Sequence, residues 1–275
     1  MIRTVPADLS PEAVAEVDAT LAAIRREHGV HIPWAIESGS RAWGFPSPDS
    51  DYDCRFVYVR PAEQLLTIWP RRDVIETPIR GLMDVNGWDM AKALRLILKG
   101  NAVVIEWLQS PIVYAGLPWF RDGMLDFAEQ WADRGRIASH YLHLARRQRA
   151  VHLDGQAEVP LKKVFYAVRP AAALRWLRLH PDKMLAPMDF STLMAESDVP
   201  AAVTEEVEDL LAQKATSREM GTGQMPGMLT AFMDAELAIA SENDAQNRAM
   251  PEAAVAAADE LFKSVTQRLG NRIEP

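Results

Sequence analysis

One stretch of this sequence reads Glu37-Ser-Gly-Ser-Arg-Ala-Trp-Gly-Phe45, and soon after it comes Asp49-Ser-Asp-Tyr-Asp-Cys-Arg-Phe-Val-Tyr58. In the second stretch, alternate residues differ in character. Tyr, Cys, Phe and Tyr alternate with Asp, Asp and Arg, as expected of a strand with two unlike faces. Side chains at positions i and i+2 of a strand project from the same face. We therefore predict a strand from Asp51 to Val59, with Asp51 and Asp53 side by side.

Two carboxylates so close together are unfavourable unless a cation lies between them. Oxygen ligands of this kind suit Mg²⁺, which keeps several waters and binds through a few carboxylates and substrate phosphates. Upstream, a predicted strand from Ile32 to Ser38 ends at Gly39 and Ser40. Backbone N–H groups at such a turn can hold a phosphate, and the Ser40 hydroxyl adds a donor. A phosphate turn beside a metal site indicates phosphoryl or nucleotidyl transfer.

Each feature alone has an ordinary explanation, since Asp-x-Asp is often a solvated strand face and Gly-Ser is often a plain turn. Together they give Gly-Ser, a ten-residue spacer, and Asp-hydrophobic-Asp-hydrophobic with Cys54 in the last position. This pattern resembles the polymerase-β nucleotidyltransferase superfamily.

The resemblance is closer to the predicted nucleotidyltransferases associated with RNA repair, the RlaP or YcgL-like group. Beyond the two stretches above, it rests on Asp84-Val-Asn-Gly-Trp-Asp-Met-Ala-Lys-Ala-Leu94, Asn101, Glu106-Trp-Leu-Gln-Ser-Pro111 and Val113-Tyr114. It covers residues 32–115, and continues more weakly through Lys162-Lys-Val-Phe-Tyr-Ala-Val-Arg169 and Arg175-Trp176.

The resemblance implies a third carboxylate on a neighbouring strand, and Asp84 and Asp89 are the two candidates. Asp84 lies in the predicted strand Leu82–Trp88 with hydrophobic residues on both sides. Asp89 is well explained as the N-cap of the following helix, so we favour Asp84, although position alone leaves both open. The expected catalytic residues are Asp51, Asp53 and Asp84. The expected ligands of two Mg²⁺ ions, which Mn²⁺ could replace, are Asp51, Asp53, Asp84 and Asp89.

Several basic residues complete the expected nucleotide site. Arg55 shares the strand face of the aspartates and would hold the triphosphate or form a structural ion pair with them. Lys92 could reach a phosphate or lie on a solvated helix face. Lys162, Tyr166 and Arg169 share a face of a later helix, where they would contact triphosphate or polynucleotide unless they are ordinary surface charges. The predicted nucleotide-binding residues are Gly39, Ser40, Arg41, Arg55, Lys92, Lys162 and Arg169.

The hydrophobic periodicity changes along the chain of 275 residues. The first part alternates strands and helices, whereas long helical patterns dominate beyond Leu117. We therefore predict an α/β catalytic domain with a mixed sheet over residues 1–116 and an all-α domain over residues 117–275 that closes one side of a cleft. The predicted strands are Ile32–Ser38, Asp51–Val59, Val74–Ile79, Leu82–Trp88 and Ile112–Tyr114. The predicted helices are residues 11–28 between Ser10 and Gly29, residues 90–99, Ala102–Leu108, Phe120–Trp131, Arg136–His152, Leu161–Leu179, Ala201–Ala212, Gly227–Ile239 and Glu252–Leu269.

Composition limits the function classes. The net charge is −8 and the isoelectric point about 5.3, which argues against broad non-specific binding to nucleic acid, although a local basic face could still bind RNA. The single cysteine, Cys54, cannot form an internal disulfide or a thiolate zinc site. No apolar run reaches the roughly 18 residues of a membrane span, and the N-terminus lacks a signal-peptide pattern. We expect a cytoplasmic protein with no membrane partner.

The expected reaction moves NMP from an NTP, with ATP the first candidate, to an acceptor hydroxyl and releases pyrophosphate. The family resemblance makes RNA a candidate acceptor, whereas the acidic composition favours a protein or a small molecule. A non-catalytic nucleotide-binding module is the alternative from another class. A binding module has no need for two adjacent carboxylates, so we favour the enzyme.

Overall fold

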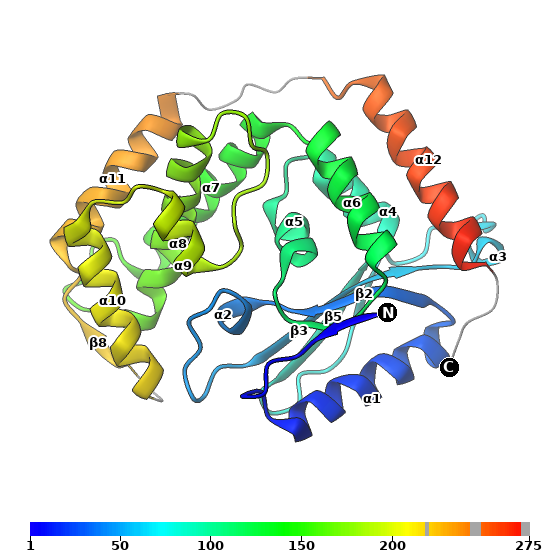
Figure 1. Ribbon diagram of the computed structural model, residues 1–275, viewed down its shortest axis with the longest axis horizontal. Helices are drawn as coiled ribbons and strands as arrows, with labels where there is room; N and C mark the ends of the chain where they lie inside the picture. The colour runs from blue at the N-terminus through cyan, green and yellow to red at the C-terminus, as the bar shows by residue number, and fades with distance from the viewer. Residues whose placement is uncertain (218–219, 243–248, 271–275) are drawn as a thin grey trace.

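The computed structural model describes residues 1–217, 220–242 and 249–270, and a mixed sheet lies at its centre (Figure 1). In these ranges the sheet has six strands in the order β1-β6-β2-β3-β5-β4. β3 and β5 run parallel, and the other neighbouring pairs are antiparallel. The strands are β1 (Ile2–Thr4), β2 (His31–Glu37), β3 (Tyr52–Val59), β4 (Val74–Glu76), β5 (Met83–Asp89) and β6 (Val113–Gly116). A separate short ribbon pairs β7 (Val159–Pro160) with β8 (Thr222–Gly223).

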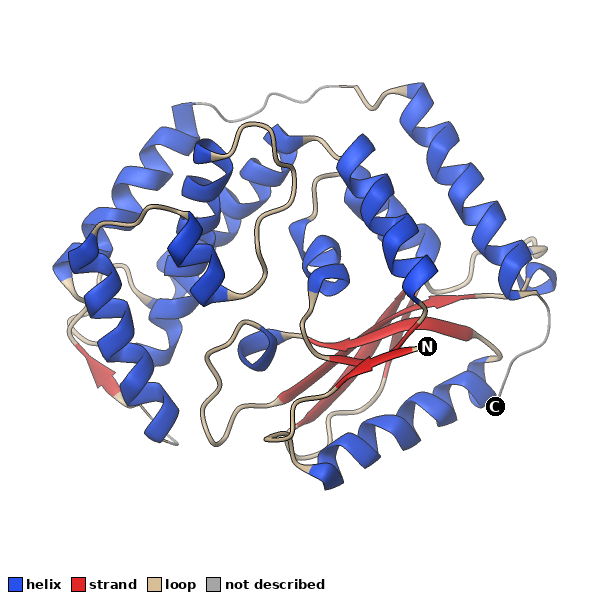
Figure 2. Cartoon of the chain, in the orientation of Figure 1, coloured by secondary structure: helices blue, strands red, loops and turns tan. Residues whose placement is uncertain are grey.

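Helix α1 (Pro11–His28) covers one face of the sheet (Figure 2). The Ser10 hydroxyl caps it by accepting the N–H of Ala13, and Gly29 ends it in the left-handed conformation, as the sequence predicts. The apolar residues that β3 turns toward this helix, Cys54, Phe56 and Tyr58, are fully buried in a core with the apolar face of α1. The predicted alternation along β3 is therefore confirmed.

Within the described residues eleven helices follow α1, and several of them cover the other face of the sheet. The helices are α2 (Gly39–Ala42), α3 (Ala62–Leu65), α4 (Met90–Leu98), α5 (Ala102–Gln109), α6 (Pro118–Trp131), α7 (Arg134–His152), α8 (Leu161–Leu179), α9 (Phe190–Glu196), α10 (Ala201–Thr216), α11 (Gly227–Glu242) and α12 (Glu252–Leu269). Helices α4, α5 and α6 pack on the strands, α7 and α8 lie beyond them, and α12 returns to pack against α4 and α6.

A single hydrophobic cluster joins the sheet to these helices. It runs from Trp34 and Val57 on the strands through Phe165 on α8 to Val265 on α12. Phe45, just after α2, stacks on Phe165 with 5.2 Å between ring centroids. The mixed α/β architecture is confirmed, but a separate all-α C-terminal domain is not, because the helical half and the sheet bury their apolar faces against each other.

Some boundaries differ from the sequence prediction. Strand β3 begins at Tyr52, so Asp51 lies one residue before it, and β4 ends at Glu76 because Ile79 belongs to an exposed turn. The sequence missed β1, α3, α9, β7 and β8, all of which are too short to establish a periodicity. Helices α8 and α12 have the predicted bounds.

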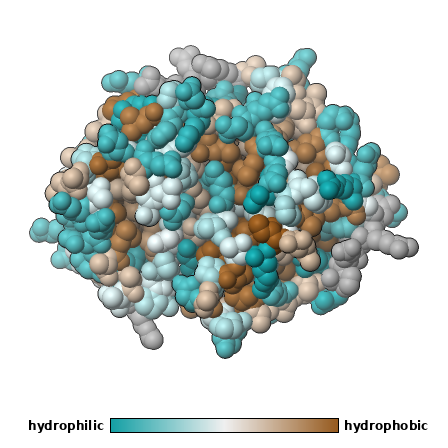
Figure 3. Space-filling view, viewed as in Figure 1, coloured by the Kyte–Doolittle hydropathy of each residue, from teal (hydrophilic) through white to brown (hydrophobic). Residues whose placement is uncertain are grey.

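The surface is mostly polar, with small hydrophobic patches between charged residues on the face drawn in Figure 3. None of the helices within the described ranges combines the length and the apolar character needed to cross a bilayer.

Candidate functional site

The parallel pairing of β3 and β5 brings two predicted site residues together. The register places Asp53 directly opposite Asp84, and their side chains are 27% and 29% exposed. Asp51 immediately precedes β3 and is exposed. Burial raises the pKa of the Asp53 carboxyl; the positive charge of Arg55 opposes the rise, and the charges of Asp84 and Asp51 add to it. Asp84 and Asp51 therefore each lie close enough to Asp53 to repel its carboxylate, as expected of a site that attracts cations.

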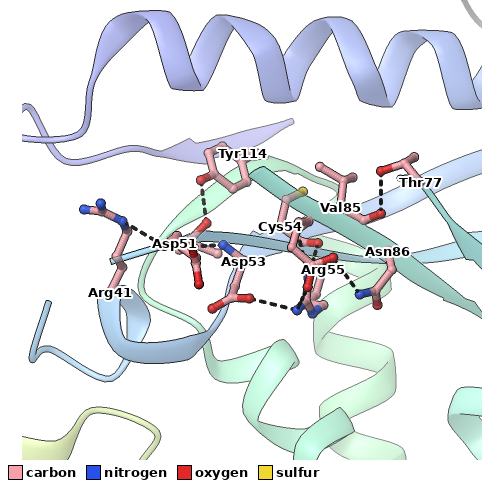
Figure 4. A network of polar contacts seen from close by, with 11 residues as sticks. Arg41, Asp51, Asp53, Cys54, Arg55, Thr77, Val85, Asn86 and Tyr114 are labelled. Carbon is pink, nitrogen blue, oxygen red and sulfur yellow. Dashed lines mark hydrogen bonds and ion pairs between the residues drawn. The ribbon is translucent and has the colours of Figure 1, made fainter. Parts of the chain in front are cut away.

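Arg55 lies between two of these carboxylates. Its Nη2 donates to Asp53 Oδ1 at 2.8 Å and to Asp84 Oδ2 at 2.7 Å. Its Nη1 donates to the main-chain oxygens of Asp84 at 2.9 Å and Cys54 at 3.1 Å (Figure 4). Of the two roles that the sequence left open for Arg55, the ion pair with the aspartates is formed in the structure.

The turn after β2 approaches the Asp53 carboxylate closely. Gly39 has φ of +60°, and a Cβ added there would lie 2.1 Å from Asp53 Oδ2. The Ser38 N–H donates to the Asp53 carbonyl at 2.9 Å and fixes the turn against the strand. Glycine is required here for two reasons, since other residues disfavour this backbone conformation and their Cβ would displace the carboxylate.

Ser40 and Arg41 hold the segment that leads into β3. The Ser40 hydroxyl donates to Ser50 Oγ at 2.9 Å, and Ser50 Oγ also accepts the N–H of Ser47 at 2.8 Å. Arg41 donates to the main-chain oxygens of Ser50 at 2.6 Å and Asp51 at 3.1 Å. Both predicted nucleotide-binding side chains thus position the segment that carries Asp51.

Glu37, to which no sequence pattern assigned a role, supports the main chain at Asp53. Its carboxylate is buried, accepts the N–H of Asp53 at 2.8 Å and accepts the hydroxyl of Tyr114 at 2.6 Å. Burial raises the pKa of Glu37 to about 7. A charged residue at the end of the otherwise apolar segment His31–Glu37 was the available signal, because a buried carboxylate needs dedicated partners.

Asp89 and Lys92 lie away from this group. Asp89 pairs in register with Tyr58, five positions further along β3 than Asp53, and accepts the N–H of Ala91 at the start of α4. Lys92 donates to Asp73 Oδ1 at 3.0 Å. The structure therefore brings Asp84, and not Asp89, next to Asp53, and it gives Lys92 a carboxylate partner on the loop before β4.

The position of Arg169 corrects a prediction. The sequence places it on an accessible face with Lys162 and Tyr166, but it is only 3% exposed. Its Nη2 lies 2.9 Å from Glu106 Oε1, and its guanidinium lies 4.5 Å from the centroid of the Trp43 ring. The periodicity is right, but this part of α8 is surrounded by protein, so Arg169 is not on an accessible face and instead forms a buried ion pair with Glu106.

Tyr166 of α8 faces the acidic group. Burial raises its pKa, and the negative charges of Asp53 and Asp51 add to the rise, so the phenol lies within electrostatic reach of both carboxylates. The Tyr166 ring also meets the Trp43 ring edge-on, with centroids 5.5 Å apart. Tyr166 is thus a side chain of the helical half that lies near the carboxylates.

Lys214 of α10 also lies near the site, although no sequence pattern indicated a role for it. It is 3% exposed, and its Nζ donates to the main-chain oxygen of Phe45. Burial lowers the pKa of Lys214 to about 8; the charge of Asp49 opposes this, and those of Lys162 and Arg41 add to it. Lys162 and Arg41 therefore lie within electrostatic reach of Lys214, beside the segment before Asp51. No local pattern marks Lys214, because only tertiary packing brings α10 to this segment.

The donor chemistry of the site fits Mg²⁺ only with help from the substrate. In the described part of the chain, no group of three or more Asp, Glu, His or Cys side chains is arranged as a complete metal site. Asp53 and Asp84 are adjacent, however, and Asp51 is close enough to affect Asp53. Mg²⁺ commonly takes a few carboxylate ligands and fills its other positions with water and phosphate oxygens, so the residues present fit the ion.

A family model described as RlaP, the RNA repair pathway DNA polymerase beta family, matches residues 14–264. The chain belongs to this family. It is also 40% identical over 214 residues to a Bacillus subtilis (strain 168) protein named "Uncharacterized protein YcgL". The aligned region covers 78% of this chain and 81% of that protein. The match to the RlaP family includes both the sheet and the helical half, and the family description points to a nucleotidyltransferase of the polymerase-β type.

Proposed function

We propose that this RlaP family member is a metal-dependent nucleotidyltransferase that moves NMP from an NTP, ATP first among them, to an acceptor hydroxyl and releases pyrophosphate. The observation that carries the proposal is the register of β3 with β5, which sets Asp53 opposite Asp84 while Asp51 stands beside them. Carboxylates brought together in this way repel one another unless a cation neutralises them.

In this proposal Asp51, Asp53 and Asp84 hold two Mg²⁺ ions. When bound, the metal would activate the acceptor hydroxyl and neutralise charge on the transferring and leaving phosphates. The chain itself aligns the acceptor with the α-phosphate. Glu37 holds the main chain of Asp53, and the turn at Gly39 lies close against the Asp53 carboxylate.

The triphosphate would lie toward the helical half. Lys162, Lys214 and Arg41 are cations close enough to influence one another, and Tyr166 faces the carboxylates from α8. A polyanion between these side chains and a metal would relieve the repulsion among the cations. The family description supports RNA as the acceptor, while the net charge of −8 limits that contact to local basic residues.

The test is incubation of the full chain with each α-labelled NTP, Mg²⁺ and a pool of cellular RNA, proteins and metabolites, with the Asp53→Asn variant as the matched control. We expect label in one fraction with the unmodified chain and none with the variant. Label in protein or metabolites would identify a different acceptor. Absence of label in every fraction, together with no pyrophosphate release, would contradict the proposed activity.

A further inference from the structure

Arg55 occupies the position between two carboxylates where a bridging cation would bind. A single nitrogen, Nη2, lies 2.8 Å from Asp53 Oδ1 and 2.7 Å from Asp84 Oδ2 (Figure 4). These are short, charge-assisted contacts of the kind that a guanidinium makes with an ionised carboxylate. The protein itself therefore already supplies one positive charge to the Asp53–Asp84 pair.

The arginine is fixed in this position by further contacts. Its Nη1 donates to the Asp84 carbonyl at 2.9 Å and to the Cys54 carbonyl at 3.1 Å, and its side chain is only 15% exposed. Arg55 is thus anchored on the strands β3 and β5 themselves. Its guanidinium is committed to the carboxylates and to the main chain before any substrate arrives.

A metal ion and this nitrogen cannot occupy the gap together. Mg²⁺ binds oxygen at about 2.0–2.1 Å, and an ion shared by Asp53 Oδ1 and Asp84 Oδ2 would stand where Nη2 now stands. Two positive charges at such a separation repel strongly in a partly buried site. Metal binding through both Asp53 Oδ1 and Asp84 Oδ2 therefore requires the guanidinium to move.

We propose, on the basis of the proposed function, that Arg55 is a resident counter-cation that holds Asp53 and Asp84 together in the metal-free protein and competes with the metal for them. The arginine keeps the carboxylates of neighbouring strands in register for the metal. It also weakens the apparent metal affinity, because a metal that binds through these two oxygens must break the ion pair. Arg55 is in this sense a positioning residue, and its displaced guanidinium becomes available to a phosphate.

Metal binding to the full chain tests this proposal without an activity assay. We would titrate Mn²⁺ and follow the free ion by electron paramagnetic resonance, using the unmodified chain, Arg55→Met and Arg55→Lys. The methionine keeps an unbranched stem and removes the charge, so we expect Arg55→Met to bind Mn²⁺ about tenfold more tightly, equivalent to about 1.4 kcal/mol. Lysine keeps the charge but not the fork, so Arg55→Lys should lie between the two. Arg95→Met, which removes a 60% exposed arginine paired with Asp73, should bind as the unmodified chain does.

Thermal melts provide a second readout. Without metal, Arg55→Met should melt at a lower temperature than the unmodified chain, because Asp53 and Asp84 then repel each other. Saturating Mn²⁺ should raise the Tm of Arg55→Met by more than it raises the Tm of the unmodified chain. If Arg55→Met does not fold, the affinity of Arg55→Lys decides.

The outcomes separate this inference from the proposed function. Equal or weaker Mn²⁺ binding by the Arg55 variants, with clear binding by the unmodified chain, would overturn the competition and leave the metal site intact. If neither the unmodified chain nor Arg55→Met binds Mn²⁺, and both behave as Asp53→Asn does, then both the metal site and the role of Arg55 fall.

Discussion

At the scale of single side chains, Asp84 and Asp89 of β5 differ in what they contact. Asp84 lies beside Asp53, whereas Asp89 caps α4. We predict that Asp84→Asn lowers nucleotidyl transfer by at least about a hundredfold, the order of effect seen when a group that stabilises transition-state charge is removed. Asp89→Asn should keep near-normal activity, because asparagine caps a helix as well as aspartate does.

Initial rates of pyrophosphate release and thermal melts of both variants check this assignment. Both variants should remain folded. Loss of activity in Asp89→Asn with retention in Asp84→Asn would reverse the choice of the third carboxylate.

Gly39 is a second position where a small change in one side chain is expected to disturb the site, because an added Cβ atom would meet Asp53. We predict that Gly39→Ala loses metal binding and transfer, because its Cβ would lie 2.1 Å from Asp53 Oδ2 and would push the carboxylate aside. The backbone strain of alanine at positive φ should also cost about 1–2 kcal/mol of unfolding free energy.

Gly155→Ala is the matched control for this substitution. Gly155 has φ of +74° and nothing within 4 Å of an added Cβ, so it should show the strain alone and keep metal binding. Denaturant melts combined with Mn²⁺ titration separate the two effects. Normal metal binding by Gly39→Ala would show that the close approach does not position Asp53.

At the scale of single elements, helix α10 makes the stability of the protein depend on pH. Lys214 has a pKa lowered to about 8 in the folded protein, against about 10.4 in an unfolded chain. Between these values the unfolded state binds more protons, so the free energy of unfolding gains a contribution that rises with pH, by up to about 3 kcal/mol. We predict that Lys214→Met removes this rise, so its stability relative to the unmodified chain falls steadily from pH 8 to pH 10.

Urea melts of both proteins at several pH values in this window provide the measurement, and groups that titrate equally in both cancel in the difference. A difference that does not change with pH would mean that the Lys214 amine titrates normally and is well hydrated. In that case burial of Lys214 beside Phe45 would not lower the pKa of its amine.

Across the whole molecule, the sheet and the helical half share one hydrophobic cluster, from Trp34 on β2 to Val265 on α12. We predict that a fragment of residues 1–116 does not fold cooperatively, because the apolar residues that now face α6 and α12 would be exposed to water. The full chain should unfold in a single transition. Circular dichroism melts of both test this, and a sharp independent transition of the fragment would show that the first 116 residues are a separate domain.

The sequence by itself determined the features that depend on neighbouring residues. The alternation in Asp51–Val59 predicted β3 and its two faces, and Ser10 and Gly29 predicted the ends of α1. The Gly-Ser and Asp-x-Asp spacing pointed to the family that the comparison confirms. Each of these is a local pattern, because strand pleat, helix period and capping act over only a few positions.

Tertiary structure alone decided which distant residues meet. The register of β3 with β5 selected Asp84 over Asp89 as the neighbour of Asp53, and the packing of α8 buried Arg169. Lys214 of α10 contacts the main chain at Phe45, and no local sequence pattern indicates this contact. Helical and strand periods fix the face on which a side chain lies, but burial and pairing depend on what covers that face. In this protein the core shared by the sheet and the later helices decides what covers α8.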